Sequence, residues 1–398
     1  MRCVRPLRDT RVSAPNRMQG MTHSLLQKFC LALVLSVGTA ALAAPVTVRK
    51  IAAPPVLHPL PMRVGGRMLV TPAAAAQAFG GRDYTYQWPG TYFRAEFAGS
   101  RVFFRIVKGD EILHVQVDGR LVATLVKPAA AVYAVAGLAP GTHRIGIYVA
   151  TESQAESNTF GGFALSSGER CLQLPERPRA IEFIGDSHTV GYGDLSATRA
   201  CTQDKVWNDT DDTSAFGPLI ARHYGADYQV NAISGRGIVR NYNGVLADTL
   251  PQAYPWVLFD KKQEYRDPAW KPQVIVIALG TNDFSTPLNP RERWKTRDQL
   301  HADFEATYLR FLESLRARNP HADIVVWATD VANGEIEAEA GKVVDQMKKR
   351  GDAHIVFVPI NGLSFTSCNS HPSLADEKTI AAKIESAIET DPRVWTKQ

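Results

Sequence analysis

The sequence predicts an α/β protein in which an N-terminal β-sandwich of jelly-roll type precedes a three-layer α/β/α domain with a parallel sheet. Three observations lead to this prediction. Segments with a period of two residues fill the first half, compact apolar runs alternate with helix-length segments in the second half, and 398 residues suit two domains. A composition of 45% hydrophobic and 21% charged residues is typical of globular proteins and excludes a disordered or collagen-like chain.

The N-terminal segment 1–43 has the features of a secretory signal peptide. Its apolar stretch 29–43 follows the basic Lys28 and ends in the small residues Ala41 and Ala43. This stretch is shorter than the roughly 20 residues of a bilayer span. We therefore expect a cleaved signal at 1–43, with an uncleaved membrane anchor as the alternative. The mature protein is then secreted or periplasmic and has no membrane partner after cleavage.

Charge outside this segment is balanced. The formal net charge of +5 arises within residues 1–43, and the remainder of the chain carries equal numbers of basic and acidic side chains. Nucleic acid is therefore not an expected partner, because binding by bulk charge needs an excess of basic residues.

The cysteines that follow the signal would lie in a compartment where disulfides persist. They are Cys171, Cys201 and Cys368, so one bridge can form among them. We predict a Cys171–Cys201 disulfide, because these two residues bracket the segment with the catalytic motif described below. Three scattered cysteines without histidines at ligand spacing predict no metal site.

The first half of the mature chain has the pattern of a β-sandwich. Residues 44–65 are rich in proline and alanine and are expected to form an extended lead-in. From 66 to 165, alternating segments separated by turn residues predict short strands, at 91–97, 101–107, 113–118 and 144–149. The polar, proline-bearing stretch 166–179 is expected to be a linker.

Residues 180–398 have the pattern of an α/β domain. Compact apolar runs predict buried strands at 180–184, 273–279, 323–328 and 354–359. The stretches between and after them predict helices at 213–224, 296–318, 335–350 and 374–389. Buried strands that alternate with helices indicate a parallel sheet covered on both faces.

Polar residues follow the predicted strands, where α/β sheets place their ligands. Ser187 comes directly after the first strand, Gly235 lies in a glycine-containing turn after the second, and Asn282 follows the third. His371 lies on a late loop before the last helix. Each residue has an ordinary structural interpretation as a helix cap, a turn or a surface histidine. Four such residues in one α/β domain nevertheless indicate a single site.

These residues resemble the four blocks of the SGNH (GDSL-type) hydrolases, in the same order. The chain is similar, more closely still, to carbohydrate esterase family two, which couples such a domain to an N-terminal jelly roll. The resemblance spans about residues 66–390 and rests on the runs 181–193, 234–242 and 371–373, and upstream on 88–92, 117–119, 137–143, 151–152 and 162–163. It implies a secreted esterase that removes O-acetyl groups from plant polysaccharides such as xylan and glucomannan. The expected partner is therefore an acetylated polysaccharide or oligosaccharide.

The chemistry of these residue types, together with the resemblance, assigns their roles. Ser187 is expected to be the nucleophile and His371 its general base, then the acid that protonates the leaving sugar. The oxyanion hole is expected to consist of the backbone N–H groups of Ser187 and Gly235 and the side-chain amide of Asn282. This mechanism requires no cofactor and no metal.

The usual carboxylate partner of the histidine is missing. Many relatives carry Asp three residues before the histidine and some carry it two before, where this chain has Cys368 and Asn369. We therefore expect a Ser–His dyad in which a carbonyl of Asn369, from the main chain or the side chain, orients the ring. Asp376 and Asp330 are the alternative acids.

Two other functions remain open. A carbohydrate-binding protein with an inactive hydrolase domain is favoured by the missing Asp and opposed by the intact serine, histidine and oxyanion donors. A lipase or thioesterase of the same superfamily is opposed by the sandwich and by the lack of a long apolar lid. The choice between acetyl-xylan and acetyl-glucomannan also stays open.

Overall fold

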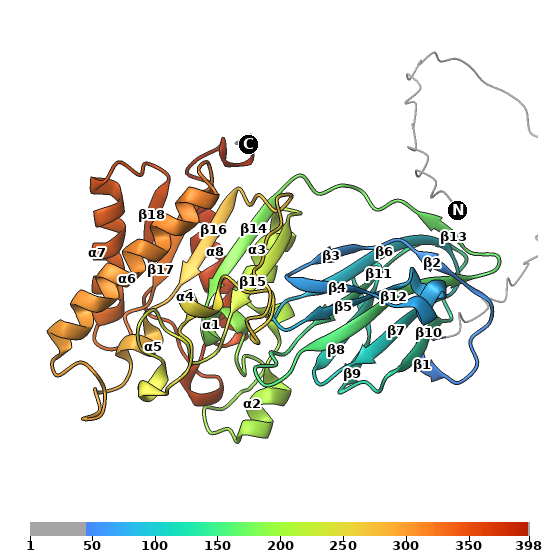
Figure 1. Cartoon of the computed structure of the whole chain (residues 1–398), viewed down its shortest axis with the longest axis horizontal. Coiled ribbons are helices and arrows are strands. Elements are labelled where there is room, and N and C mark those ends of the chain that lie inside the picture. Colours follow the sequence, from blue (N-terminus) through green and yellow to red (C-terminus); the bar gives the residue numbers. More distant parts are fainter. Residues whose placement is uncertain (1–44, 397–398) are drawn as a thin grey trace, which may run out of the picture.

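The computed structural model describes residues 45–396, so the predicted signal peptide at 1–43 lies outside the described residues. Antiparallel strands from the first half of the chain and an α/β unit from the second half lie side by side (Figure 1). The predicted fold class is confirmed, because the antiparallel sheets precede a parallel five-stranded sheet with helices. Among the helices within residues 45–396, none has the length and apolar character needed to cross a membrane.

Two antiparallel sheets form the sandwich. The first has the order β1-β10-β7-β12-β5-β4, with β2 paired to β12. Its strands are β1 (Thr47–Ile51), β2 (Leu57–Leu60), β4 (Met68–Pro72), β5 (Arg82–Tyr86), β7 (Val102–Lys108), β10 (Ala131–Ala136) and β12 (Asn158–Ser166). The second has the order β13-β6-β11-β8-β9, with β3 paired to β6. Its strands are β3 (Arg63–Gly65), β6 (Tyr92–Gly99), β8 (Ile112–Val117), β9 (Arg120–Val126), β11 (Gly141–Val149) and β13 (Arg170–Leu172).

Alternating residues of both sheets form the core of the sandwich. Phe93 and Phe97 of β6 are fully buried together with Phe104 of β7 and Phe160 of β12. The rings of Phe93 and Phe160 stack across the two sheets, with their centroids 4.2 Å apart. Each strand thus turns one face toward the opposite sheet, as the period of two residues predicts. Fully burying each such side chain contributes about 1.5–3 kcal/mol.

The stretches expected as a lead-in and a linker also contribute strands. Within 44–65, β1 pairs with β10, β2 with β12 and β3 with β6. Within 166–179, β13 pairs with β6. The reason is that these stretches carry isolated apolar side chains, such as Leu60 and Cys171, which the sandwich core buries. Their proline content limits these strands to short lengths.

The parallel sheet has the order β15-β14-β16-β17-β18. Its strands are β14 (Ala180–Gly185), β15 (Asp227–Ala232), β16 (Val274–Ala278), β17 (Asp323–Ala328) and β18 (Ile355–Pro359). Every residue of β16 is buried, because helices cover both faces of the sheet. One face packs against α6 (Arg297–Arg318) and α7 (Glu335–Lys349), and the other against α3 (Phe216–His223) and α8 (Leu374–Ile388). The shorter helices are α1 (Ser187–Val190), α2 (Gln203–Asp209), α4 (Leu250–Ala253) and α5 (Thr281–Phe284), and the 3-10 turns are η1 (Ala74–Phe79), η2 (Asp212–Ser214), η3 (Tyr242–Gly244), η4 (Cys368–Ser370) and η5 (Val394–Thr396).

The strand order creates a switch point at the end of β14. This first strand of the sheet has β15 on one side and β16 on the other, so the chain continues first to one side and later to the other. Loops diverge at such a point and leave a crevice beyond the carboxyl ends of the strands. Ser187 follows β14 at this point.

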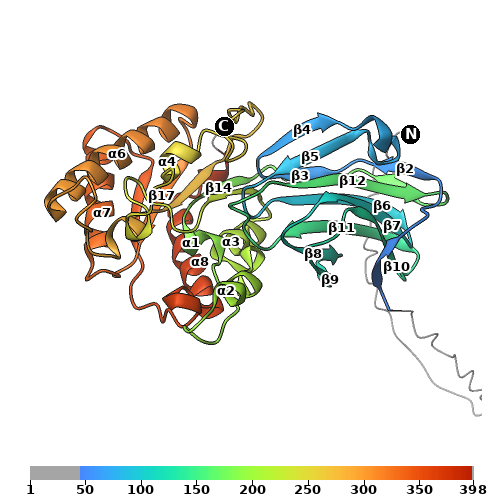
Figure 2. The same ribbon diagram turned by 60° about the horizontal axis from the view of Figure 1, so that its bottom comes forward.

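The sandwich packs directly against the α/β unit (Figure 2), beside β15 (Figure 1). Tyr92 Oη donates a hydrogen bond to Asp227 Oδ1 at 3.1 Å, and Arg94 forms an ion pair with the same carboxylate. Trp88 is fully buried and belongs to the core of the α/β unit. Gly90 has φ +62°, and a Cβ there would lie 2.5 Å from Asp212 Oδ2, so the close approach of the two units requires glycine. The sandwich is therefore part of the framework that surrounds the site.

Candidate active site

Ser187 is placed by the end of a central strand. It is the first residue of α1, directly after β14, and it is 5% exposed. The side chain of Asp186 caps this helix by accepting a hydrogen bond from the His188 amide at 3.1 Å. A Cβ at Gly185 would lie 2.0 Å from the Thr189 hydroxyl, so the sharp transition from strand to helix needs glycine there. The serine hydroxyl is consequently held at the carboxyl edge of the sheet.

The structure brings His371 to this serine from a position 184 residues later. His371 Nε2 lies 2.9 Å from Ser187 Oγ, a hydrogen-bond distance. The other ring nitrogen, Nδ1, lies 2.9 Å from the main-chain carbonyl oxygen of Cys368. An Nδ1–H donated to that carbonyl leaves Nε2 as the acceptor for the serine hydroxyl. This tautomer is the one that a general base needs.

The surroundings keep the His371 ring neutral. Burial lowers its pKa to about 4, and backbone hydrogen bonding with Cys368 and Asn369 acts in the opposite direction. The Tyr192 ring lies 4.2 Å from the His371 ring, and the His188 ring lies 5.5 Å away, edge-on. Burial also lowers the pKa of His188, to about 3, with the neighbouring His371 as a further cause. Both rings are therefore uncharged near neutral pH.

The role predicted for a carbonyl of Asn369, to orient the histidine, falls mainly to Cys368. The acceptor is the carbonyl of Cys368, and the main-chain carbonyl of Asn369 adds only a smaller upward effect on the pKa of His371. The Asn369 side chain points elsewhere and donates to Tyr192 Oη at 3.3 Å. The physical reason is the turn of η4, in which Asn369 (φ 52°) and Ser370 (φ 61°) reverse the chain and face the preceding carbonyl toward the ring.

The alternative acids lie in other environments. The carboxylate of Asp376 accepts hydrogen bonds from the amides of Ser364, Phe365 and Ser373 at 2.8–3.0 Å and caps α8. Burial tends to raise the pKa of Asp376, but these hydrogen bonds outweigh it and hold the pKa below its usual value. Asp330 is exposed on the loop after β17. Because the Cys368 carbonyl is the hydrogen-bond partner of His371 Nδ1, the Ser187–His371 pair has the geometry of a catalytic dyad.

Besides Ser187 itself, the residues predicted to form the oxyanion hole follow β15 and β16, the two strands that flank β14 and therefore Ser187. The turn at Gly235 (φ 81°) is closed by the Tyr242 amide, which donates to the Gly235 carbonyl at 2.9 Å. Within residues 45–396, the amides of Ser187 and Gly235 donate no hydrogen bond to another protein group. The Asn282 amide donates to Asp186 Oδ2 at 3.0 Å and to the Arg236 carbonyl at 2.9 Å, so it links the ends of three strands.

Two buried carboxylates hold these strand ends in place. Asp283 accepts hydrogen bonds from three consecutive amides, those of Ile238, Val239 and Arg240, at 2.9–3.0 Å. Burial raises the pKa of Asp283 to about 6, with these hydrogen bonds acting against the rise. Burial raises the pKa of Asp186 further, to about 7, and the neighbouring Asp283 adds to it. Both acids bind main-chain or amide groups, whereas the partner of the histidine Nδ1 is the Cys368 carbonyl.

The sandwich also contributes to the site, which the sequence reasoning did not assign. Glu152 Oε2 accepts a hydrogen bond from the Ser234 amide at 3.1 Å, and Gln154 Nε2 donates to the Ser234 carbonyl at 3.0 Å. Burial raises the pKa of Glu152, and its hydrogen bonds with Ser234 oppose the rise. These contacts fix both main-chain groups of the residue that precedes Gly235. The only signal in the sequence was the match of 151–152 to the resembled family.

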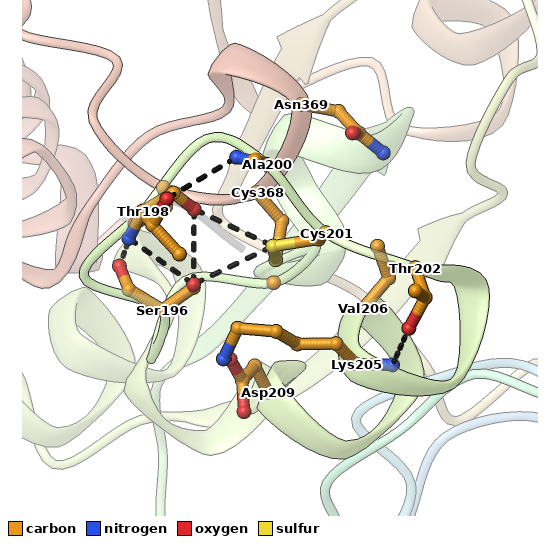
Figure 3. Close-up of a disulfide and its surroundings, with 12 residues drawn as sticks. Ser196, Thr198, Ala200, Cys201, Thr202, Lys205, Val206, Asp209, Cys368 and Asn369 are labelled. Carbon is orange, nitrogen blue, oxygen red and sulfur yellow. Dashed lines mark hydrogen bonds and ion pairs between the residues drawn. A yellow bond between two sulfur atoms is a disulfide. The ribbon is translucent and has the colours of Figure 1, made fainter.

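The predicted Cys171–Cys201 disulfide is wrong. Cys201 is bonded to Cys368, with a Cα–Cα distance of 5.4 Å (Figure 3). Cys171 lies on β13 in the sandwich, where its strand pairs with β6. Cys201 instead lies before α2, on a segment that runs past the histidine loop, where the Asn369 amide donates to the Arg199 carbonyl at 2.8 Å. The prediction failed because bracketing the catalytic motif in the sequence does not bring Cys171 and Cys201 together in the fold.

A group of side chains that could bind a metal occurs elsewhere in the described part of the chain. Ligand atoms of Asp323, His354 and Asp391 lie within 4.8 Å of one another, and His354 Nδ1 is 3.0 Å from Asp323 Oδ1. Asp323 opens β17 and His354 precedes β18, so this group lies at the opposite edge of the sheet from Ser187. It takes no part in the chemistry of the Ser187–His371 pair.

Comparisons with known proteins agree with this architecture. The chain matches the family model Carbohydrate esterase 2 N-terminal over residues 79–175 and the model GDSL-like Lipase/Acylhydrolase family over residues 183–384. An acetylxylan esterase / glucomannan deacetylase of Cellvibrio japonicus is 43% identical over 338 residues, which cover 85% of this chain and 93% of that protein.

Solved structures show the same pairing of units. A carbohydrate esterase whose active site displays divergent catalytic and non-catalytic binding functions is 40% identical, with a TM-score of 0.80 over 85% of this chain and 99% of that one. A family two carbohydrate esterase from Clostridium thermocellum, in complex with cellohexaose, is 25% identical, with a TM-score of 0.71 over 83% of this chain and 98% of that one. The chain therefore belongs to carbohydrate esterase family two, and its α/β unit is an ester hydrolase domain of the SGNH (GDSL-like) superfamily.

Proposed function

We propose that this esterase removes O-acetyl groups from plant polysaccharides of the acetyl-xylan or acetyl-glucomannan type through a Ser–His dyad. The observation that carries the proposal is the chain of contacts from Ser187 Oγ to His371 Nε2 and from His371 Nδ1 to the Cys368 carbonyl, each at 2.9 Å. The substrate class is supported by the 43% identical relative, an acetylxylan esterase / glucomannan deacetylase. The expected ligand is accordingly an acetylated polysaccharide or oligosaccharide.

The mechanism proceeds in two half-reactions. Ser187 Oγ attacks the acetyl carbonyl carbon while His371 Nε2 accepts the hydroxyl proton, and the resulting imidazolium returns that proton to the leaving sugar oxygen. Water, deprotonated by His371 Nε2, then attacks the carbonyl carbon of the acetyl-enzyme. The imidazolium returns this proton to Ser187 Oγ as the ester bond breaks, and acetic acid leaves and ionises to acetate. Burial keeps His371 neutral and ready as a base, with a pKa of about 4. Among the described residues, the Nδ1 partner of His371 is a carbonyl and not a carboxylate, so stabilisation of the oxyanion carries more of the rate enhancement.

The oxyanion would be stabilised by the amides of Ser187 and Gly235, which donate to no other group among the described residues. Asn282 supplies the third donor by exchanging its hydrogen bond with the Arg236 carbonyl, 2.9 Å away, for one to the oxyanion. Its second hydrogen bond, to Asp186, would keep the amide in orientation during this exchange.

We also propose that the enzyme is exported after cleavage of the segment 1–43. Support comes from the apolar run 29–43 with its basic flank and small terminal residues. Outside the cell envelope or in the periplasm, the enzyme would encounter soluble fragments of plant polysaccharides. N-terminal sequencing of the secreted protein tests the cleavage site.

The decisive experiment measures acetate release from a panel of acetylated xylan, acetylated glucomannan and a triacylglycerol emulsion. The expected result is release from the polysaccharides and not from the lipid, with none from the Ser187→Ala variant. Binding of the polysaccharide without acetate release by the wild-type protein would favour the carbohydrate-binding alternative instead. A preference for long-chain lipid esters would favour a lipase.

A further inference from the structure

The carbonyl that orients His371 depends on an unusual turn. Between Cys368 and His371, both Asn369 (φ 52°) and Ser370 (φ 61°) adopt the left-handed conformation. Asparagine adopts this conformation more readily than other non-glycine residues, but two such residues in succession, one of them serine, are uncommon and are held by surrounding contacts. The turn is not part of a long helix or a strand. The position of the Cys368 carbonyl therefore depends on the tertiary contacts that hold the turn in place.

The contacts that fix the turn come from one stretch of chain, residues 194–201, which we call the flanking segment. Ser367 Oγ donates to the Ser196 carbonyl at 2.9 Å, and the Asn369 amide donates to the Arg199 carbonyl at 2.8 Å. The Arg199 guanidinium donates to the carbonyls of Phe365 and Ser364, at 2.7 and 2.9 Å. The flanking segment follows α1 and thus belongs to the same part of the chain as Ser187.

The disulfide is the covalent member of this set of contacts. Cys368 is fully buried, and a Cβ at Gly193 would lie 2.4 Å from its Cβ, so the turn sits closely against the start of the flanking segment. Cys201 is partly exposed, with its Sγ 3.4 Å from the Thr198 carbonyl and 3.5 Å from Ser196 Oγ. Figure 3 shows Cys368 reaching Cys201 while the Asn369 side chain extends away from the bond. The bond thus fixes the very residue whose carbonyl faces the histidine.

A carbonyl acceptor makes such fixation more important than a carboxylate would. A carboxylate attracts an imidazolium through its full charge, and this attraction declines slowly with distance. A neutral carbonyl acts through a directional hydrogen bond, which weakens steeply when the angle or the distance changes. The orientation of His371 is therefore sensitive to small displacements of Cys368.

We propose that the Cys201–Cys368 disulfide is a positioning element of the active site, which holds the Cys368 carbonyl opposite His371 Nδ1 in place of the missing carboxylate. The proposal rests on the Ser187–His371 mechanism proposed above. The polar neighbours of the Cys201 sulfur are Ser196 and Thr198, and the link from the bond to His371 is the Cys368 main-chain carbonyl, so we infer that the bond acts through the main chain of the turn. Breaking it should impair proton transfer and leave substrate binding nearly unchanged.

The experiment compares kcat and KM on 4-nitrophenyl acetate for the oxidised wild type, the Cys201→Ser variant, the Cys368→Ser variant and the double variant. A displacement of about 1 Å in the reacting groups costs about 100-fold in rate. We expect kcat to fall by about 10- to 100-fold in all three variants, with KM within about threefold of the wild type. Because both single changes break the same bond, their effects should not add in the double variant.

Arg199→Ala is the matched control. It removes two hydrogen bonds to the carbonyls of Ser364 and Phe365, which precede the turn, and it leaves both the disulfide and the main-chain hydrogen bond from Asn369 to Arg199 intact. The fall in kcat should therefore be clearly smaller than in the cysteine variants. An equal loss in Arg199→Ala would overturn the special role of the bond. Wild-type kcat in Cys201→Ser, with a loss only in Cys368→Ser, would assign the effect to packing of the buried side chain and would also overturn the proposal.

Near-UV circular dichroism separates positioning from general stabilisation. The variants should keep the wild-type spectrum at the assay temperature and should react more slowly with a serine-directed phosphonate. Loss of the spectrum together with activity would mean that the bond serves the whole fold, and the positioning proposal would then be wrong. Absence of Ser187-dependent hydrolysis by the oxidised wild type would instead refute the proposed function, so the two failures are distinguishable.

Discussion

The two partners of the Ser187–His371 pair are held in different ways. Ser187, Gly235 and Asn282, which we call the strand side, each follow a strand of the parallel sheet. His371 and the Cys368 carbonyl, which we call the loop side, lie in and after the single turn η4. Buried strands and helices fix the strand side, whereas hydrogen bonds to neighbouring loops and a disulfide fix the loop side.

The difference shows how a serine hydrolase site can function with an incomplete triad. On the strand side, the end of a buried strand sets the approximate position of each group, and hydrogen bonds to Asp186, Asp283 and Glu152 hold the adjoining chain. On the loop side, a neutral carbonyl replaces a charged acceptor, and its place must be fixed by tertiary contacts. The strand side should therefore respond to changes of chemical groups, and the loop side to changes of geometry.

The largest expected effect comes from removing either member of the pair. Ser187→Ala and His371→Ala should each lower kcat by about 10⁵- to 10⁶-fold, because nucleophile and base act as one unit. The double variant should lose no more than either single variant. Acetate release from an acetylated oligosaccharide measures this, with unchanged thermal unfolding as the control. Substantial activity in His371→Ala would show that the loop side does not supply the base.

The next effect tests a donor of the strand side. Asn282→Ala should lower kcat by about 10²- to 10³-fold, the usual loss for one oxyanion donor. Gly235→Ala is the matched control, because a Cβ there meets nothing within 4 Å and the amide remains. The Gly235→Ala change should cost only the free energy needed to hold an alanine in the left-handed conformation, and kcat should fall by less than about tenfold. Similar losses in both variants would contradict the assignment of Asn282.

The pH profile tests the loop side, with an expected difference of about 30-fold in the neutral fraction of His371 at pH 5 between the buried ring and an ordinary histidine. His371 must be neutral to accept the serine proton, so activity should persist above its pKa of about 4 and decline only below it. At pH 5 most of the enzyme should be active, whereas an ordinary histidine, with a pKa of about 6.5, would leave about 3% in the neutral form. The measurement is kcat/KM from pH 3.5 to 8, with circular dichroism to exclude acid unfolding. An acid limb at pH 6.5 or above would indicate a carboxylate partner or an exposed ring.

The smallest effect concerns the alternative acids. Asp376→Asn should lower the free energy of unfolding by about 1 kcal/mol, because the carboxylate caps α8, and should change kcat less than tenfold. Asp330→Asn, at an exposed position, should change neither. Denaturant unfolding and steady-state kinetics check both. A loss of several orders of magnitude in kcat in a folded variant would reveal a carboxylate that completes a triad. The loop side would then resemble that of an ordinary serine hydrolase.

The sequence by itself predicts the fold class and the strand side of the site. Apolar runs such as 273–279 predict buried strands, and parallel strands end at one edge of a sheet, so Ser187, Gly235 and Asn282 were expected to lie close together. The helix predicted at 296–318 agrees with α6 at Arg297–Arg318, because one face of it carries apolar residues at regular spacing. Local patterns suffice wherever secondary structure fixes position.

Only the tertiary structure decided the loop side. Which cysteines pair depends on which loops cross, and the flanking segment meets the histidine turn through main-chain hydrogen bonds that no side-chain pattern encodes. The same holds for the acceptor at His371 Nδ1, since every residue has a carbonyl and only the turn selects that of Cys368. The contact of Glu152 with the Ser234 amide likewise requires the sandwich to dock beside β15. Local sequence patterns determine the helices and strands. Contacts between loops, and hydrogen bonds to particular main-chain atoms, arise only when those helices and strands pack together.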